Sequence, residues 1–463
     1  MLFRRIGREI LAVAIVSFAG IGCSGSHPCT SGPGAEALYV AHDGVLVSYD
    51  IACGTERPGT VTNVLSPTDM QALEDGTVLV NLTAANATDI VDGQSMLERG
   101  RVSSPMGGTR PVHSYISPER AGKRYWLALY DGQGSDLATS RARFIDIEAG
   151  SPSYLQGAGE VGLGIGHHKA AFSNTQQRVI VSNISDCGNV FSAYDYTNIG
   201  SVQRLKTWAA TDLGWNTPAK TCNPNTNPMS PHGCATSKLS GEVYCNITAS
   251  GEIAVMKIDA SPPQLQTIIQ THGSGSGYTR AYPGGRFIYS LQEKPREGFG
   301  GATCQVGQLA VIDVSTDTLA TTVPLLYKGP GCNTPNAGTD EASVEPDHIR
   351  VSADAKTLYI SIAGAFGDNN SHARQELVVD VTNPAAPVQK ASIPVGLSTG
   401  HHGDALSGDG KWLFVTNNLD GTVTQVDTSS NRVTRTLTVR STPLTLATFG
   451  TAEGPSDQTG PIR

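Results

Sequence analysis

The chain has 463 residues and a formal net charge of −8, and only 16% of its residues are charged. An acidic chain without a basic run beyond its first nine residues is a poor nucleic-acid binder, so we exclude that class. Abundant glycine (52) and proline (26) favour many short strands joined by tight turns over helices. A single core of this length requires a repeating or ring-shaped architecture.

The N-terminus is predicted to be an export signal over residues 1–22. Three arginines precede an apolar segment, residues 10–22, which has signal-peptide length and is short for a membrane span. Cys23 follows directly, and the small and apolar residues before it resemble a bacterial lipoprotein box, although Gly20 stands where leucine is usual. This resemblance implies a lipid on Cys23, a flexible tether over residues 23–35 and a membrane partner. A plain secretory signal is the alternative.

The cysteines support export to an oxidising compartment. There are nine, so eight remain if Cys23 carries lipid, and an even number is typical of a disulfide framework. Eight cysteines allow 105 connectivities. If each cysteine pairs with the next cysteine along the chain, four disulfides are expected: Cys29–Cys53, Cys187–Cys222, Cys234–Cys245 and Cys304–Cys332. We therefore expect a protein of the cell envelope, either an outer-membrane lipoprotein or a periplasmic or extracellular protein.

Internal repeats predict the fold. Residues 405–439 contain four short strands separated by Asp-Gly and polar turns, the pattern of one propeller blade. This unit resembles the YVTN family of β-propeller repeats, with its Tyr-Val-x-Asn strand written as Phe414 to Asn417 and with Gly408 in place of proline.

Weaker copies of this unit recur upstream at intervals of about 50 residues. The resemblance implies an all-β chain forming a single β-propeller over residues 36–450, as a monomer, with a disordered polar tail at 451–463. Eight blades are expected, or seven if the poor copy around Thr68 merges with a neighbour. The first unit lacks its leading strand and the last segment supplies one, so the N- and C-terminal strands are expected to share a blade and close the ring.

Seven of the eleven histidines fall at one position of the repeat, the entry to a blade's first strand. They come from five blades. In a propeller the first strands line the central channel, so these histidines are predicted to ring its mouth and to bind metal there. The seven are His113, His167, His168, His232, His348, His401 and His402.

Neutral imidazole is a common ligand of copper and zinc. The His-His and Pro-His-Gly entries are similar to those of the propeller domain of nitrous oxide reductase, which implies copper first and zinc second. That resemblance does not extend to a second, cupredoxin-like domain, so nitrous oxide reduction is not implied. Structural or pH-sensitive histidines are the alternative interpretation. Asp347 and Asp404 lie beside the histidines, either as outer partners of the imidazoles or as turn residues.

Three function classes follow from these features. The first is a lipoprotein propeller that acts as a ligand- or partner-binding scaffold, with a histidine metal site at the channel mouth. The second is a copper-dependent periplasmic redox enzyme or a copper carrier. A propeller hydrolase or lactonase with one Ca²⁺ is the third, and the shortage of channel carboxylates argues against it. Long polar insertions at residues 206–230, 293–305 and 327–345 are candidates for a protein-binding surface on the loop face.

The lipoprotein hypothesis predicts the chemistry of the mature N-terminus. Mass spectrometry of the protein purified from a bacterial envelope should find diacylglyceryl-Cys23 as the first residue. An unmodified N-terminus at any other residue would reject lipid anchoring.

Overall fold

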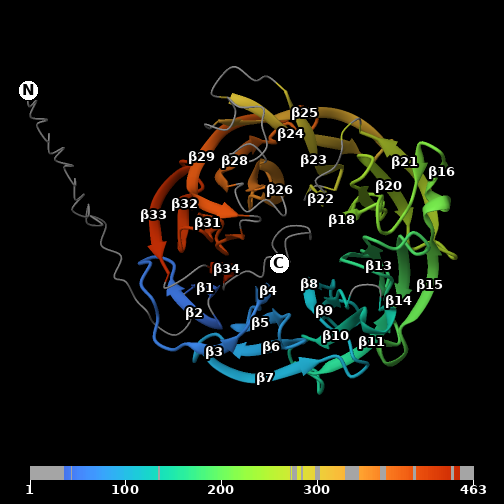
Figure 1. The fold of residues 1–463 in the computed structure, drawn as a ribbon. Helices are drawn as coiled ribbons and strands as arrows, with labels where there is room; N and C mark the ends of the chain where they lie inside the picture. The colour runs from blue at the N-terminus through green and yellow to red at the C-terminus, as the bar shows by residue number, and fades with distance from the viewer. Residues whose placement is uncertain are drawn as a thin grey trace, which may run out of the picture.

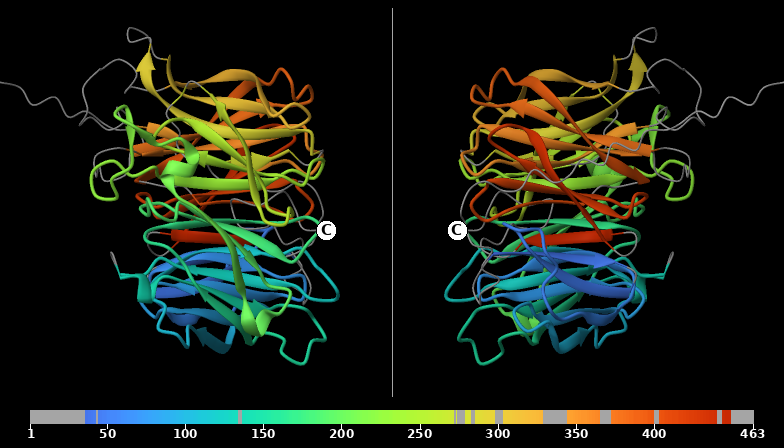
Figure 2. Two further views of the ribbon diagram at one scale, coloured as in Figure 1. Left: turned by 90° about the vertical axis from the view of Figure 1, so that its right-hand side faces the viewer. Right: turned by 90° about the vertical axis from the view of Figure 1, so that its left-hand side faces the viewer.

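The structure is a computed structural model that describes residues 36–42, 44–133, 136–271, 273, 279–282, 285–297, 303–328, 344–364, 372–399, 403–439 and 443–448. Within these residues, eight four-stranded antiparallel sheets stand around a central axis (Figure 1). The side views show a thick disc with the strands running across it (Figure 2). The predicted all-β propeller with eight blades is therefore confirmed.

Each blade from the second to the eighth is a meander of four consecutive strands, numbered from the channel outward. Blades 2, 3 and 4 are β4 (Pro67–Ala72), β5 (Thr77–Leu82), β6 (Ala87–Asp92), β7 (Leu97–Ser103); β8 (Pro111–Ile116), β9 (Tyr125–Tyr130), β10 (Arg141–Asp146), β11 (Gly157–Gly162); and β12 (His168–Phe172), β13 (Arg178–Asn183), β14 (Phe191–Asp195), β15 (Gln203–Trp208). Blades 5 and 6 are β18 (Pro231–Thr236), β19 (Val243–Ile247), β20 (Glu252–Lys257), β21 (Gln264–Gln270); and β22 (Thr279–Ala281), β23 (Phe287–Glu297), β24 (Thr303–Asp313), β25 (Thr318–Lys328). Blades 7 and 8 are β26 (Val344–Val351), β27 (Thr357–Gly364), β28 (His372–Asp380), β29 (Val388–Thr399); and β30 (Asp404–Leu406), β31 (Trp412–Asn417), β32 (Thr422–Asp427), β33 (Arg432–Thr438).

Blade 1 joins the two ends of the described chain. Its strands are β1 (Ala37–His42), β2 (Gly44–Asp50), β3 (Val61–Val64) and β34 (Pro443–Thr448). The C-terminal strand β34 takes the innermost position and pairs antiparallel with β1, opposing Leu446 to Val40. This pairing removes the open sheet edges at both ends, and it confirms the expected closure.

Burial explains which residues form which strand. The second strands β5 and β9 are buried at every residue because neighbouring blades cover both of their faces, and apart from Asn81 their sequences consist of apolar and β-branched residues. Outermost strands such as β7 and β33 are mostly exposed and mix polar with apolar residues. A strand's position in its blade can thus be recognised from its composition.

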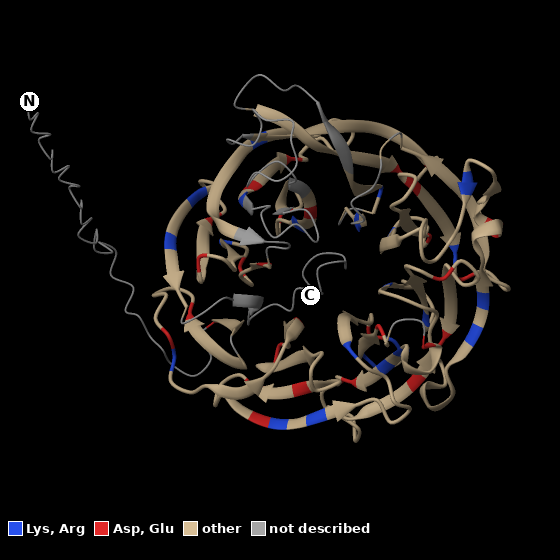
Figure 3. Ribbon diagram, in the orientation of Figure 1, with Lys and Arg blue, Asp and Glu red and all other residues tan. Residues whose placement is uncertain are grey.

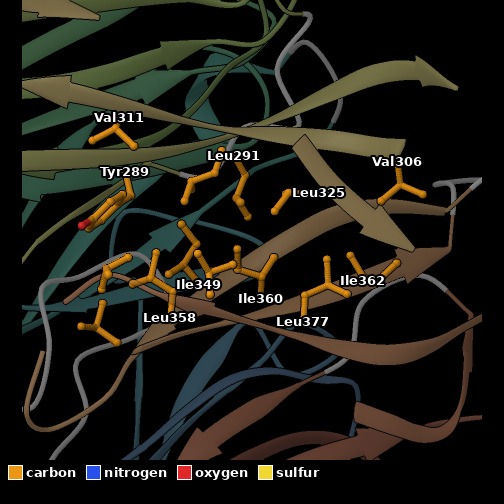
Figure 4. Packing of buried hydrophobic residues seen from close by; sticks show 14 of the residues in the cluster. Tyr289, Leu291, Val306, Val311, Leu325, Ile349, Leu358, Ile360, Ile362 and Leu377 are labelled. Atoms are coloured by element: carbon orange, nitrogen blue, oxygen red, sulfur yellow. The ribbon is translucent and has the colours of Figure 1, made fainter. Parts of the chain in front are cut away.

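Apolar side chains between neighbouring blades form the core. Leu291 and Leu325 of blade 6 face Ile349, Ile360 and Leu377 of blade 7, and all five are almost wholly buried (Figure 4). Similar clusters fill the other interfaces, so the core is a ring of interfaces around the channel. Each blade is stabilised by both of its neighbours.

The insertions differ from the polar loops that we expected. Residues 293–297 and 303–305 continue β23 and β24, with Glu297 opposite Gln305, because continued pairing satisfies backbone groups that a loop would leave to water. In the 206–230 insertion, β15 runs on to Trp208. A 3₁₀ turn and the small hairpin β16 (Asn216–Thr217) and β17 (Lys220–Thr221) follow it. This 3₁₀ turn is η3 (Ala210–Leu213). Elsewhere in the described chain, 3₁₀ turns are found at η1 (Leu137–Thr139) and η2 (Ile199–Ser201). No helix among the described residues has the length and apolar character needed to cross a bilayer.

Two of the predicted disulfides, Cys187–Cys222 and Cys234–Cys245, are confirmed. The first ties the 206–230 insertion to the loop after β13. The second joins directly opposed residues of β18 and β19. Cys53 and Cys304 are also disulfide-bonded. The cysteines that we expected to pair with them lie outside the described residues, as do Cys23, the signal peptide, the tether and the polar tail.

Removing the Cys234–Cys245 disulfide should lower the free energy of unfolding by about 3 kcal/mol, because its closed loop of roughly 12 residues constrains the unfolded chain. Urea denaturation of the Cys234→Ala, Cys245→Ala double variant beside the wild type measures this difference. The two proteins should become equally stable in reductant, apart from packing effects. Free thiols at both positions in a non-reducing peptide map would contradict the assignment.

Candidate metal centre

Two of the inner strands that carry predicted histidines, in blades 3 and 5, begin with a turn that blade 2 shares. In blades 2, 3 and 5, a residue with positive φ directly precedes a proline that starts the strand. These residues are Ser66 (53°), Arg110 (59°) and Ser230 (51°). Few L-residues adopt this conformation, so its recurrence marks a specified geometry. A shift of register follows each proline, and such a bulge changes the direction of the next side chains.

The entry segments are held by the loop between the second and third strands of the same blade. The Asp131 amide donates to the Arg110 carbonyl at 3.0 Å, and the Ile184 amide donates to the His167 carbonyl at 3.0 Å. In blade 5 the Thr248 amide donates to the Ser230 carbonyl at 3.2 Å. The backbone on which each histidine sits is therefore fixed by its own blade.

Three of the predicted histidines meet at the channel mouth. His113, His167 and His232 come from the consecutive blades 3, 4 and 5, and each offers a ring nitrogen within 4.8 Å of those of the other two. The ring centroids of His113 and His167 are 4.4 Å apart, and those of His167 and His232 are 5.4 Å apart. The three rings are half-buried. We call this group the histidine cluster.

Asp131 supports the cluster from behind. One of its carboxylate oxygens lies 2.6 Å from His167 Nδ1, and the other lies 3.1 Å from His168 Nδ1. Burial alone would raise the pKa of Asp131. The neighbouring His167 and the hydrogen bonds from both imidazoles outweigh burial and hold the pKa well below its usual range. Asp131 is therefore ionised and accepts from both rings.

The Asp131 contact selects the tautomer of His167. Because the carboxylate accepts the Nδ1 proton, Nε2 of neutral His167 carries a lone pair directed at the cluster. His113 Nε2 lies 2.6 Å from that atom, so the His113 ring donates to it. Ligand bonds of 2.0–2.1 Å at tetrahedral angles would separate two nitrogens by about 3.3 Å. For a metal ion to lie between these atoms, the rings would move slightly apart and the proton of neutral His113 would shift from Nε2 to Nδ1.

His113 is kept neutral by its surroundings. Burial lowers its pKa well below the usual value, and the nearby Lys169, His167, His232 and His348 lower it further. A neutral ring is the form that ligates metals. His113 is therefore in the protonation state that coordination requires.

His168 and His348 are not among the three histidines whose ring nitrogens converge. His168 is fully buried, and its Nε2 faces the Gly164 carbonyl at 3.1 Å while its Nδ1 faces Asp131, so both ring nitrogens are engaged within the protein. His348, on blade 7, has Nδ1 2.8 Å from the Asp347 carboxylate. His401 and His402 lie outside the described residues. Metal binding by these four histidines stays a prediction.

The arrangement also corrects the alignment of the repeats. In the sequence, His168 and His232 each stand five residues before the serine of the turn that follows the strand, Ser173 and Ser237, which aligns these two histidines. In the structure, however, His167 is the residue whose ring contacts that of His232. The reason is local: β18 shifts register after Pro231, whereas β12 begins directly at His168 without a bulge, which leaves His167 in the preceding turn.

Asp131 is not among the predicted site residues, because an Asp-Gly sequence directly after a strand is typical of an ordinary turn. The repeat supplied a signal, since that loop lies beside the next blade's histidine pair.

The two interpretations of Asp347 and Asp404 are now distinguished by contact. Asp347 pairs with the His348 ring, as an outer partner would, and Asp404 instead accepts from Arg350 Nε at 2.8 Å.

Comparison with known proteins supports the fold. No family model and no curated protein sequence matches the chain. Apo AztD from Citrobacter koseri is a similar structure, with a TM-score of 0.55 and 14% identity over 91% of this chain and 98% of that one. The dihydro-heme d1 dehydrogenase NirN in complex with DHE has a TM-score of 0.54 and 12% identity over 91% and 75% of the two chains. The periplasmic gluconolactonase PpgL of Pseudomonas aeruginosa has a TM-score of 0.54 and 16% identity over 83% of this chain and 98% of that one. At these identities the likeness shows a common fold.

Replacing Asp131 should weaken metal binding without removing a ligand. In Asp131→Asn the amide can donate to His167 Nδ1, which moves the imidazole proton onto Nε2 and blocks its lone pair. Zinc affinity measured by calorimetry should fall by roughly 10- to 100-fold. Asp195→Asn, which loses a carboxylate elsewhere on blade 4, is the matched control and should bind as the wild type does. Equal affinities in all three proteins would contradict the role of Asp131.

Proposed function

We propose that the protein is a metal-binding propeller of the cell envelope, in which His113, His167 and His232 together hold one transition-metal ion at the channel mouth. The observation that carries this proposal is the convergence of three imidazoles from three successive blades. Disulfides are typical of proteins outside the cytoplasm, which supports the location. A lipid on Cys23 would keep the protein at the membrane.

The donor set suits zinc or copper. No cysteine joins the cluster among the described residues, and imidazole nitrogens are ligands for Zn²⁺ and Cu²⁺ alike. Zinc is often held by three histidines, with a fourth coordination position open to water. Zinc is therefore the first ion to test, and copper, the first choice from sequence, is the second.

The surroundings favour binding and delivery of the ion. His167 is 29% exposed and lies at the entry turn rather than within a strand, so an incoming ligand can reach the metal from the channel. An open fourth position allows another protein to supply a ligand before the histidines release the ion. We infer that the protein carries the ion and passes it to a partner at the loop face.

Removing any member of the cluster should abolish high-affinity binding. His167→Ala and His232→Ala should each lose more zinc affinity than the roughly 10- to 100-fold expected for an outer partner, because a direct ligand is gone. Calorimetry and elemental analysis of untagged protein measure affinity and stoichiometry. His272→Ala is the matched control, because His272 is not one of the seven histidines predicted at the blade entries, and it should keep one ion. Loss of metal in that variant alone would overturn the proposed ligand set.

Acid should release the metal. Imidazoles take up protons as the pH falls through their ordinary pKa near 6.5, and a protonated ring cannot ligate. The lowered pKa of His113 keeps that ring neutral in the native state, while the unfolded chain binds a proton below about pH 6.5. Stability without metal should therefore also decline as the pH falls through this window.

Melting temperatures with and without zinc, measured from pH 8 to pH 5, test both effects. A concentration of zinc 100 times the Kd should stabilise the protein by about 2.7 kcal/mol at the upper pH. This increment should vanish toward the lower pH. An increment that does not change with pH would exclude histidine ligation.

A further inference from the structure

A cavity lies between the outer parts of blades 2 and 3. Its volume is about 530 Å³, within the usual range for small-molecule sites of roughly 300 to 1,000 Å³. It is lined by Ile90, Arg99, Gly100, Arg101, Val102, Ser103, Pro105, Arg143, Tyr154, Leu155, Gln156 and Gly157. Residues 154–157 follow β10 at its Asp146 end, whereas Asp131 and the histidine cluster lie near its Arg141 end. The cavity is therefore separate from the candidate metal centre.

Three guanidinium groups line the cavity, and none of the described lining residues is acidic. Two of the carboxylates that pair with these arginines are partly exposed, namely Asp92 beside Arg99 and Glu98 at 3.9 Å from Arg101, and two others are buried. Arg101 forms two hydrogen bonds with Asp89, whose side chain is fully buried, and Glu160, also buried, lies 3.7 Å from Arg143. Positive residues are visible on β7, the outermost strand of blade 2 (Figure 3). The acids hold the guanidinium groups in place, and the N–H groups they leave unused are available to an anion.

Arg143 is the least satisfied of the three arginines. Its Nη1 donates to the Gly159 carbonyl at 3.3 Å, and its buried Nε has no hydrogen-bond partner among the described residues. The guanidinium passes over Gly157, where a Cβ atom would lie 1.8 Å from Nη2. Only glycine at position 157 leaves room for Arg143 to reach the cavity. A buried donor without a partner costs free energy, so the hydrogen-bonding capacity of this guanidinium is not fully used within the described protein.

Part of the remaining wall is apolar, beside the polar residues Ser103 and Gln156. Ile90, Val102 and Leu155 line the cavity together with the ring of Tyr154. The Tyr154 hydroxyl donates to Asp75, so the aromatic ring is fixed in position. An inorganic anion would leave this apolar wall uncovered. A ligand with a carboxylate and a compact hydrophobic body would satisfy both parts of the cavity.

We propose that this cavity binds a small amphipathic organic acid, with its carboxylate on Arg143 and Arg101 and its apolar body against Leu155, Val102 and Tyr154. The proposal does not depend on the metal function, because none of these residues touches the histidine cluster. Arg143 provides the main charge, since its guanidinium is the one whose hydrogen-bonding capacity is least used.

The probe for this site is 1-naphthoate, titrated into the full-length mature protein and followed by calorimetry. Its uncharged isostere, 1-naphthalenemethanol, should bind about tenfold more weakly or worse, because it cannot form a charge-assisted pair with a guanidinium. Arg143→Met should reduce naphthoate affinity by a similar factor. Arg286→Met is the matched control, since Arg286 also pairs with a carboxylate, Asp313, on another blade. It should bind naphthoate as the wild type does.

Three results would overturn the proposal: no binding of naphthoate, equal binding of acid and alcohol, or equal losses in the two arginine variants. Inorganic phosphate that binds as tightly as naphthoate would show an adventitious anion only. Melting temperatures check that both variants fold. If Arg143→Met does not fold, Gly157→Ala, which displaces the guanidinium without removing it, must also reduce naphthoate binding.

Discussion

The antiparallel pairing of β34 with β1 is the contact on which the rest of the molecule depends. It places the last described strand in the innermost position of the first blade and turns a linear series of sheets into a closed ring. Closure fixes the angle between neighbouring blades, because each blade must pack against two others through buried apolar faces. Inner strands then line one channel, and residues at their starts meet at one mouth.

This geometry explains how distant residues form one site. His113 and His232 are more than a hundred positions apart in the sequence. Three successive blades nevertheless bring His113, His167 and His232 within ligand distance of one another. The turns before the strands supply the fine adjustment. A left-handed residue and a register shift direct His113 and His232, whereas His167 uses the end of the preceding turn. Asp131 then fixes the His167 ring, so the cluster combines backbone placement with selection of the imidazole tautomer.

Much of the fold could be predicted from sequence because each blade repeats its own local pattern. Strand alternation and Asp-Gly turns are local signals, and the half-units at the two ends implied closure. The two confirmed disulfides were likewise predicted from neighbouring cysteines. The inserted segments were predicted less well, since residues 293–297 and 303–305 belong to paired strands although their polar sequence resembles a loop.

The site was harder to predict, because the direction of a side chain depends on single-residue bulges. The repeat placed His168 and His232 at equivalent positions, and one register shift made His167 the residue that meets His232. Asp131 follows its strand as an ordinary turn residue would, and its role requires the packing of blade 3 against blade 4. Pairing between blades is a property of the closed ring, and a single repeat does not encode it.

Whether the three histidines together hold one metal ion can be tested by anomalous X-ray diffraction from crystals soaked in zinc, at wavelengths on either side of the zinc absorption edge. We predict one strong anomalous peak among His113, His167 and His232, with bonds of about 2.0–2.1 Å to three imidazole nitrogens. The same peak should be absent from crystals of His167→Ala. A wild-type map with no peak in the histidine cluster, or with zinc only at surface carboxylates, would contradict this prediction.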